Sequence, residues 1–299
     1  MSLNKQIWID TVAEVLRQDN SFASKITDYS EYASGTILHI PNAGIPGTLV
    51  SKNLTSWPVS AATFRTDVDN AITMDIYYLN PIQLATPVEE LQFNYNKRSS
   101  VMLASLSELK ENIHNGLILD MSVGSTVYTG TGSGRTCLNS AQTGNRSAIT
   151  YTDVLKVQYL FNSQNIPTEG RYMLVPAELQ NDILGMTQFN NSELLTNQST
   201  IDGFVGKIAG FNVILRSTVL LTTSGGTLKT NQTYATSDCA AALFFSTATV
   251  FKSVGNIDIY EDIQNPFYMG DIISGKCPAK GGNKFATPKG IAVLAEKTA

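Results

Sequence analysis

The strongest constraint on this chain is a long amphipathic segment, residues 87–119. Its apolar residues recur three, four or seven positions apart, which places them in one stripe along an α-helix. The stripe consists of Leu91, Tyr95, Met102, Leu106, Leu109, Ile113 and Leu117. Pro87 is typical of a helix start, and residues 116–119 predict an exit into a strand. At about 1.5 Å per residue the helix would be roughly 40 Å long, so we expect it to lie across a sheet.

The region before this helix has the alternating pattern of β-strands. A first strand is expected at residues 36–40, ending at Pro41. Two longer strands, residues 57–67 and 71–79, are expected to form a hairpin through a turn at residues 67–70. Two strands alone are marginally stable in water. The hairpin must therefore pack on its own domain or on a neighbouring subunit.

The N-terminal region predicts a short amphipathic helix, residues 3–18, followed by an extended arm, residues 18–34. The arm has few apolar residues and no clear period. Four of its side chains are suited to docking on a neighbouring copy of the chain: Phe22, Ile26, Tyr29 and Tyr32.

The region after the long helix predicts a compact α+β domain. A helix at residues 152–165 is expected to be capped by Thr150 or Thr152, and a helix at residues 177–184 is opened by Pro176 and stopped by Gly185. Strands are expected at residues 171–175, 211–221, 240–254, 257–260, 269–275 and 290–294. The fold class is therefore α+β.

The composition indicates assembly. Charged residues make up 15% of the 299 residues, against an average of about 25%. Interface cores are depleted of charge, so a chain that mostly contacts its own copies needs less of it. The net charge of −4 gives no general affinity for nucleic acid or anionic membranes. We expect no membrane span and no secretory signal, and we expect the three widely spaced cysteines, Cys137, Cys239 and Cys277, to stay reduced.

The search for catalytic chemistry finds no site. Residues 130–135, GTGSGR, lack the Lys-Ser or Lys-Thr of a phosphate-binding loop and lead into another Gly- and Ser-rich stretch, so a flexible surface loop is expected. His39 and His114 have no partner pattern for a nucleophile or a metal. Asp67 and Asp69 fall in the expected turn, where Asp is common. We therefore predict no enzyme activity, no catalytic residues, no cofactor and no metal site.

The order of arm, two-stranded loop, long helix, α+β domain and closing strands resembles the major capsid proteins of tailed double-stranded DNA bacteriophages, which share the Hong Kong 97-type fold. The resemblance covers nearly the whole chain and depends mainly on element order. Four stretches also look like that family: residues 5–8 (KQIW), 35–41 (GTILHIP), 211–214 (FNVI) and 289–294 (KGIAVL).

The resemblance implies a domain division. Residues 1–35 would be an N-terminal arm and residues 36–85 an extended loop over the adjacent subunit. Residues 86–119 and 251–299 would form the peripheral domain with its spine helix, and residues 120–250 the axial domain around five-fold and six-fold axes. The loops at residues 129–134 and 222–237 are then candidates for contacts at these axes.

The resemblance also implies partners and a location. Pentamers and hexamers of this chain would form an icosahedral shell in the virion, assembled in the bacterial host cytoplasm. We expect a separate scaffolding protein, a portal and decoration proteins, and no proteolytic removal of a leading segment. Lys97 and Arg98 are a modest basic patch, which predicts only weak, sequence-independent contact with packaged DNA. Lys52 lies on the expected loop, but no Asn partner or catalytic acid is singled out, so crosslinking is not predicted.

Two alternatives remain open. A tail-tube or decoration protein also self-assembles, but such proteins are mostly sheet, and the long helix argues against them. An α+β hydrolase or transferase would require a converging polar site, which the sequence does not show.

Overall fold

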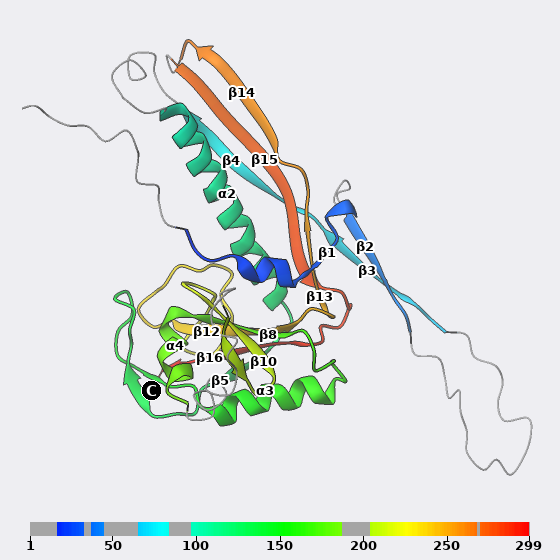
Figure 1. Ribbon diagram of the computed structural model, residues 1–299, viewed down its shortest axis with the longest axis vertical. Coiled ribbons are helices and arrows are strands. Elements are labelled where there is room, and N and C mark those ends of the chain that lie inside the picture. The colour runs from blue at the N-terminus through cyan, green and yellow to red at the C-terminus, as the bar shows by residue number, and fades with distance from the viewer. Residues whose placement is uncertain are drawn as a thin grey trace, which may run out of the picture.

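The computed structural model describes residues 17–32, 37–44, 65–83, 97–186, 204–267 and 270–298. These residues form a compact sheet domain and an elongated part, which we call the blade (Figure 1). The expected helix at residues 3–18 and strand at residues 57–67 lie almost entirely outside the described residues. The start of the long helix, residues 87–96, and Lys52 lie outside them as well.

The sheet domain is built on a seven-stranded mixed sheet with the strand order β5-β16-β12-β8-β10-β9, and β11 pairs with β12. The strands are β5 (Thr126–Thr129), β8 (Arg171–Pro176), β9 (Phe204–Ile208), β10 (Phe211–Arg216), β11 (Leu220–Thr222), β12 (Cys239–Ser246) and β16 (Ile291–Ala295). A separate three-stranded sheet joins β6 (Gly134–Thr136), β7 (Asn145–Ser147) and β17 (Lys297–Thr298).

Both faces of the seven-stranded sheet are covered. Helices α3 (Tyr151–Ser163) and α4 (Ala177–Leu184) pack on one face, in a cluster that includes Phe161 and Phe244. The C-terminal end of helix α2 (Lys97–Ser122) packs on the other face, where Met121 is buried in a second cluster. Central strand β12 is buried along its whole length, as expected of a strand covered on both sides.

The blade is a thinner structure in which helix α2 lies along a second sheet (Figure 1). Its strands are β4 (Asp75–Gln83), β13 (Val250–Val254), β14 (Asp258–Asn265) and β15 (Gly270–Asn283), and short β1 (Thr27–Asp28) extends the sheet beside β13. The contact between helix and sheet is a small cluster of five buried residues: Leu109, Ile113, Leu117, Cys277 and Ala279. Three residues of the predicted stripe thus face the sheet.

Helix α2 does not end where the sequence predicted. Residues 116–119 continue the helix, which ends at Ser122, so the predicted exit into a strand is wrong. Ile118 and Met121 are fully buried because this last turn packs on the seven-stranded sheet. Gly116 allows the side chain of Tyr77 to approach, since a Cβ atom at position 116 would lie 1.7 Å from the Tyr77 hydroxyl oxygen. Glycine therefore serves close packing inside the helix.

The predicted hairpin has a different partner. Residues 67–70 are not a turn, because strand β3 (Val68–Thr73) runs through most of them. β3 pairs antiparallel with β2 (Ile37–Asn42), the strand expected at residues 36–40, while β4 pairs with β15. The two-stranded sheet β2–β3 extends from the base of the blade (Figure 1).

The N-terminal segment 17–32 packs on its own chain. It contains the short helices η1 (Ser21–Lys25) and η2 (Ser30–Tyr32). Phe22 and Ile26 are buried at the junction of α2 and the sheet domain, and Tyr29 stacks on Phe251 with ring centroids 5.8 Å apart. The expectation that Phe22 and Ile26 dock on a neighbouring copy is therefore wrong, whereas Tyr29 stays partly exposed. Tyr32 remains 63% exposed.

The helices after α2 agree with the sequence. α4 spans the predicted residues and is followed by Gly185. α3 is capped by Thr150, with a reciprocal capping box formed by Asp153. The predicted strands at residues 211–221 and 240–254 are each divided in two, as β10 and β11 and as β12 and β13.

Candidate functional site

In the described part of the chain, the two histidines and three cysteines lie apart from one another in different surroundings. His39 pairs with Asp69 at 2.6 Å on the exposed β2–β3 sheet. His114 lies on α2, edge-on to Phe22, and burial lowers the pKa of its imidazole. The three cysteines are free, and no group of three or more His, Cys, Asp or Glu side chains among these residues is placed to bind a metal. No described helix is long and apolar enough to span a membrane.

The Gly-rich loop binds a carboxylate of the protein itself. The Thr131 amide and hydroxyl both donate to the Asp153 carboxylate, at 2.9 Å. Thr150 donates to the same carboxylate from its amide and hydroxyl, and Lys156 pairs with it at 2.9 Å. The Gly130 amide donates to the Ala295 carbonyl. The loop is thus fastened to the sheet domain, which differs from the flexible surface loop expected from its composition.

The electrostatics of Asp153 show how firmly this anion is held. Burial alone would raise the pKa of Asp153, but hydrogen bonds from Lys156, Thr131 and Thr150 outweigh burial and lower the pKa to about 2. The carboxylate occupies the N-terminus of α3, where a bound phosphate would otherwise be favoured. The geometry therefore agrees with the sequence argument against a phosphate cradle.

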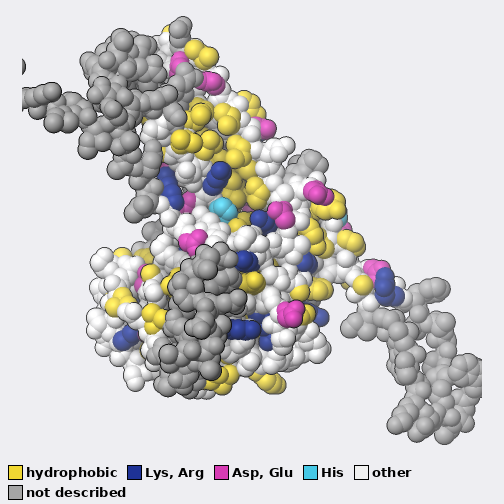
Figure 2. All heavy atoms as spheres, in the orientation of Figure 1, with side chains coloured by type: hydrophobic (Ala, Val, Ile, Leu, Met, Phe, Trp, Pro, Cys, Tyr) yellow, Lys and Arg dark blue, Asp and Glu magenta, His cyan; other side chains and the backbone are white. Residues whose placement is uncertain are grey.

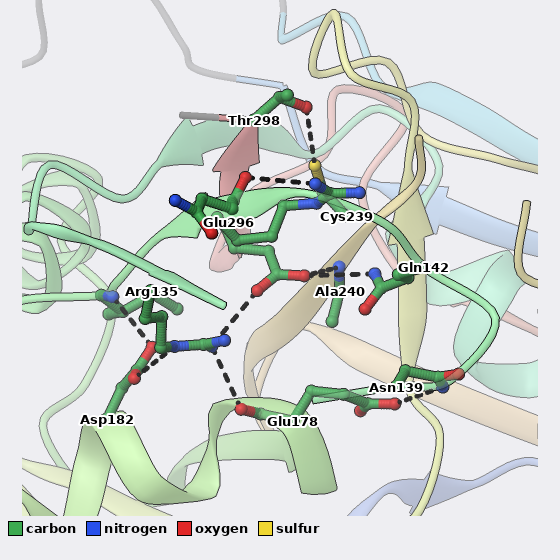
Figure 3. Close-up of polar contacts among 12 residues, drawn as sticks. Arg135, Asn139, Gln142, Glu178, Asp182, Cys239, Ala240, Glu296 and Thr298 are labelled. Atoms are coloured by element: carbon green, nitrogen blue, oxygen red, sulfur yellow. Dashed lines mark hydrogen bonds and ion pairs between the residues drawn. The ribbon is translucent and has the colours of Figure 1, made fainter. Parts of the chain in front are cut away.

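A second polar cluster connects α4, the β6–β7 region and the end of the chain (Figure 3). Arg135 forms ion pairs with Asp182 at 2.7 Å and with Glu296 at 3.2 Å. Both carboxylates are almost fully buried, and burial raises the pKa of Glu296. Tyr234 donates to Glu178 at 2.7 Å. We call these residues, with Asn139 and Gln142, the Arg135 network.

The blade exposes many large apolar side chains. Figure 2 shows hydrophobic side chains gathered along this elongated part. The exposed large hydrophobic residues of the blade are Ile76, Tyr78, Met102, Leu103, Ile259, Tyr260, Ile263 and Phe267. Phe267 is 91% exposed and Tyr78 is 68% exposed. Exposed apolar side chains gathered on one part of a folded domain indicate an interaction site.

Strand register divides this surface between two faces. Cys277 faces α2, so its neighbours in β15, Lys276 and Pro278, face away from the helix. Tyr78 pairs with Lys276 across the strands, and Tyr260 lies beside them with the Lys276 ammonium 5.8 Å from its ring. The face without a helix therefore carries two exposed tyrosines around one lysine.

The unpaired strand edges of the blade also indicate an interaction site. Among the described strands, β14 pairs only with β15, which leaves its outer edge open over Asp258–Asn265. The β2–β3 sheet also exposes Ile37 and Val68. Its described hydrogen bonds to the blade come from Asn42 and Asn70, which donate to backbone carbonyls of residues 283 and 284. Open strand edges template pairing with other chains unless they are protected.

The comparisons with known proteins agree with this picture. The fold is similar to the "Capsid structure of the Cyanophage P-SCSP1u", with a TM-score of 0.62, 18% sequence identity, and coverage of 98% of this chain and 92% of that chain. It is also similar to the "Acidic stable capsid structure of Helicobacter pylori bacteriophage KHP30", with a TM-score of 0.68, 11% identity, and coverage of 98% and 95%. The "Capsid of Ralstonia phage GP4" gives a TM-score of 0.66 at 9% identity, with coverage of 99% and 96%.

The chain has the fold of a bacteriophage capsid protein. This confirms the α+β, Hong Kong 97-type fold predicted from the sequence. No protein-family model matches the sequence, and a search of curated proteins finds no relative. The similarity to phage capsid structures is therefore found by comparing three-dimensional folds and not by comparing sequences.

Sequence reasoning did not find the exposed surface of the blade or the Arg135 network. One signal for the network was present: Glu296 follows five consecutive apolar residues, 291–295, in a chain with few charges. A carboxylate next to such a buried strand needs a partner. The side chains of Lys97 and Arg98, the expected basic patch, lie outside the described residues.

Proposed function

We propose that this chain is a major capsid protein that assembles into the icosahedral head shell of a tailed phage around its double-stranded DNA. The observation that carries the proposal is the blade. It exposes apolar side chains and open strand edges within a fold shared, over nearly its full length, with phage capsid structures. The role is mechanical, and we propose no enzymatic activity.

The proposed shell supplies the partners. Copies of the chain would form pentamers and hexamers, with a separate scaffolding protein, a portal and decoration proteins as further components. Contact with packaged DNA would be weak and independent of sequence. The protein would be part of the virion and would assemble in the host cytoplasm.

The proposed domain division follows the one implied by the sequence. Residues 1–35 form the arm, 36–85 the extended loop, 86–119 and 251–299 the peripheral domain, and 120–250 the axial domain. Two strands cross these boundaries in their sheet pairings, β4 out of the proposed extended loop and β16 out of the proposed peripheral domain. β4 contributes to the sheet of the blade, and β16 lies between β5 and β12 in the seven-stranded sheet.

The proposal is tested by electron microscopy of the purified chain, alone and with co-expressed scaffolding protein. We expect closed shells, or rings of five and six subunits. A stable monomer under both conditions would contradict the proposal.

A paired substitution tests the blade itself. Y78D/Y260D places two carboxylates on the helix-free face, and both side chains are exposed, so the fold is expected to be kept within about 0.5 kcal/mol each. Assembly is expected to be lost because burying an unpaired charge in an interface is costly. Y78F/Y260F keeps both rings and is expected to assemble. Normal shells from Y78D/Y260D would exclude this face as an interface.

A further inference from the structure

The N-terminal segment, residues 17–32, crosses the junction of the sheet domain and the blade (Figure 1). On the side of the sheet domain, Phe22 and Ile26 are buried in one cluster with residues of α2, β10 and β12. On the side of the blade, β1 pairs with β13, and the Tyr29 amide donates to the Lys252 carbonyl at 2.8 Å. The segment therefore fastens the two parts of the subunit to each other.

A histidine lies where this segment is most deeply buried. The ring of Phe22 is fully buried and meets the imidazole of His114, on α2, edge-on with the ring centroids 6.0 Å apart. The guanidinium of Arg216 lies 5.8 Å from the centre of the same phenyl ring. It donates to Asn20 of the segment at 3.4 Å and to Asn115, the residue after His114. One phenyl ring of the segment therefore lies against both a titratable group and a buried cation.

The charges around this imidazole disfavour its protonated form. The charged residues of the elements packed here are Arg17, Asp19, Lys25, Asp28 and Glu31 of the N-terminal segment, Lys110 and Glu111 of the adjacent turn of α2, Arg216 of β10 and Lys252 of β13. The charges with the largest effect on the imidazole are three cations, Arg216, Lys252 and Lys110. Two of the carboxylates, Glu111 and Asp28, are already held in ion pairs with other cations. Burial first, and then these three cations, lower the pKa of the imidazole and outweigh the backbone carbonyl of Lys110, which favours the protonated form.

We propose that the N-terminal segment is an acid-sensitive latch, which protonation of His114 releases from the junction of the blade and the sheet domain. The proton adds a buried charge beside Arg216, and the cost of that charge is relieved once the segment detaches and water reaches the imidazole. Docking of the segment is therefore strongest above pH 6.5, the ordinary pKa of histidine, and weakens as the pH falls below that value. Because release takes up one proton, the docking equilibrium constant falls by at most about tenfold per pH unit. The latch goes beyond the proposed function, since it depends only on contacts within one subunit.

Hydrogen exchange of unassembled full-length subunits, compared above and below pH 6.5, tests the latch. After correction for the pH dependence of chemical exchange, the protection of amides 21–26 is expected to fall by up to about tenfold per pH unit in acid, while amides of β12 change little. H114Q keeps a neutral side chain and is expected to remove this pH dependence. H39Q changes the only other histidine of the chain and is expected to retain it. A pH dependence that persists in H114Q would assign it to another group and overturn the proposal, as would equal protection of the parent protein across this range.

A second measurement leaves His114 in place. Coupling between protonation and docking is reciprocal, so loosening the segment must raise the pKa of His114 towards its ordinary value. An NMR titration of the imidazole signals is expected to show this rise in F22A, where the buried ring is lost. Y32A changes an exposed aromatic residue of the same segment and is expected to leave the His114 titration as it is in the parent protein. A His114 titration that is the same in F22A and the parent protein would overturn the latch, whether or not H114Q folds.

Discussion

Truncating Phe22 tests how the N-terminal segment is held. Phe22 is fully buried, its ring meets His114 edge-on at 6.0 Å, and the Arg216 guanidinium lies 5.8 Å from its centre. Arg216 is itself 3% exposed, and burial lowers its pKa to about 10. Its described hydrogen bonds go to Thr218, Asn115 and Asn20, which are neutral groups. The Phe22 ring therefore covers a buried cation without a directly bonded carboxylate.

The magnitude of this effect follows from the contacts. Phe→Ala in a core costs about 3–5 kcal/mol, and the loss of a desolvated cation–π contact adds to it. At about 2–4 °C per kcal/mol, F22A is expected to lower the Tm by roughly 6–20 °C. If the segment detaches before the domain unfolds, the Tm falls less and trypsin cleaves earlier after Lys25. Differential scanning calorimetry and timed trypsin digestion of unassembled subunits distinguish these two results.

Tyr32 supplies the matched control for this experiment. It is an aromatic residue of the same segment but 63% exposed, so Y32A is expected to change the Tm by little. Equal stability and equal trypsin sensitivity of F22A, Y32A and the parent protein would refute the docking of residues 17–32 on their own chain.

Three other substitutions test individual contacts. G116A places a Cβ atom 1.7 Å from the Tyr77 hydroxyl oxygen and is expected to cost about 1–3 kcal/mol, and adding Y77F is expected to recover part of that loss in thermal unfolding. D153N removes the carboxylate held by the Gly-rich loop and is expected to cost about 2 kcal/mol at neutral pH. The pKa of Asp153 is lowered from 3.8 to about 2, so the stabilisation by its carboxylate is complete above pH 3.8 and is lost as the pH falls through about 2. The free energies of unfolding of D153N and the parent protein, measured by denaturant titration, are therefore expected to converge near pH 2. R135M leaves Asp182 and Glu296 buried without their cation and is expected to cost about 3–5 kcal/mol in the same assay, whereas a loss under 1 kcal/mol would show that the network contributes little.

The sequence predicted best those elements whose ends are marked locally. α4 begins after Pro176 and ends before Gly185, and α3 has its capping box within the first turn. The interruptions at residues 217–219 and 247–249 have no comparable marker. Short polar runs, Arg-Ser-Thr at residues 216–218 and Ser-Thr-Ala-Thr at residues 246–249, lie there between apolar strands, but neither contains the Pro or Gly that marks an element's end.

The sequence-based predictions that were wrong all concern contacts between segments far apart in the chain. The partner of β3 is β2, separated from it by a long connection, whereas the nearest candidate in sequence suggested a hairpin. Phe22 and Ile26 are buried by α2 and by the sheet domain, which no local pattern reveals. Gly116 suggested the end of the helix, but its role depends on Tyr77, a residue of another strand. Tertiary packing overrides local preference in each case.

The distribution of buried residues differs between the blade and the sheet domain. The two clusters of the sheet domain contain 18 and 15 buried residues, whereas the cluster under the middle of α2 contains five. Stability against local opening follows the number of buried apolar contacts. The blade of a free subunit is therefore expected to open more readily than the sheet domain. In the proposed shell, contacts with neighbouring subunits would supply the burial that one chain lacks.

Hydrogen exchange measures this difference directly. In unassembled subunits, amides of β14 (Asp258–Asn265) are expected to exchange much faster than those of β12 (Cys239–Ser246), which is buried along its length. In assembled shells, exchange of β14 is expected to slow, because its open edge and exposed side chains become covered, while β12 serves as the internal reference and changes little. Equal protection of the two strands in free subunits would contradict the argument from core size. Unchanged exchange of β14 on assembly would instead show that another surface of the chain forms the contacts between subunits.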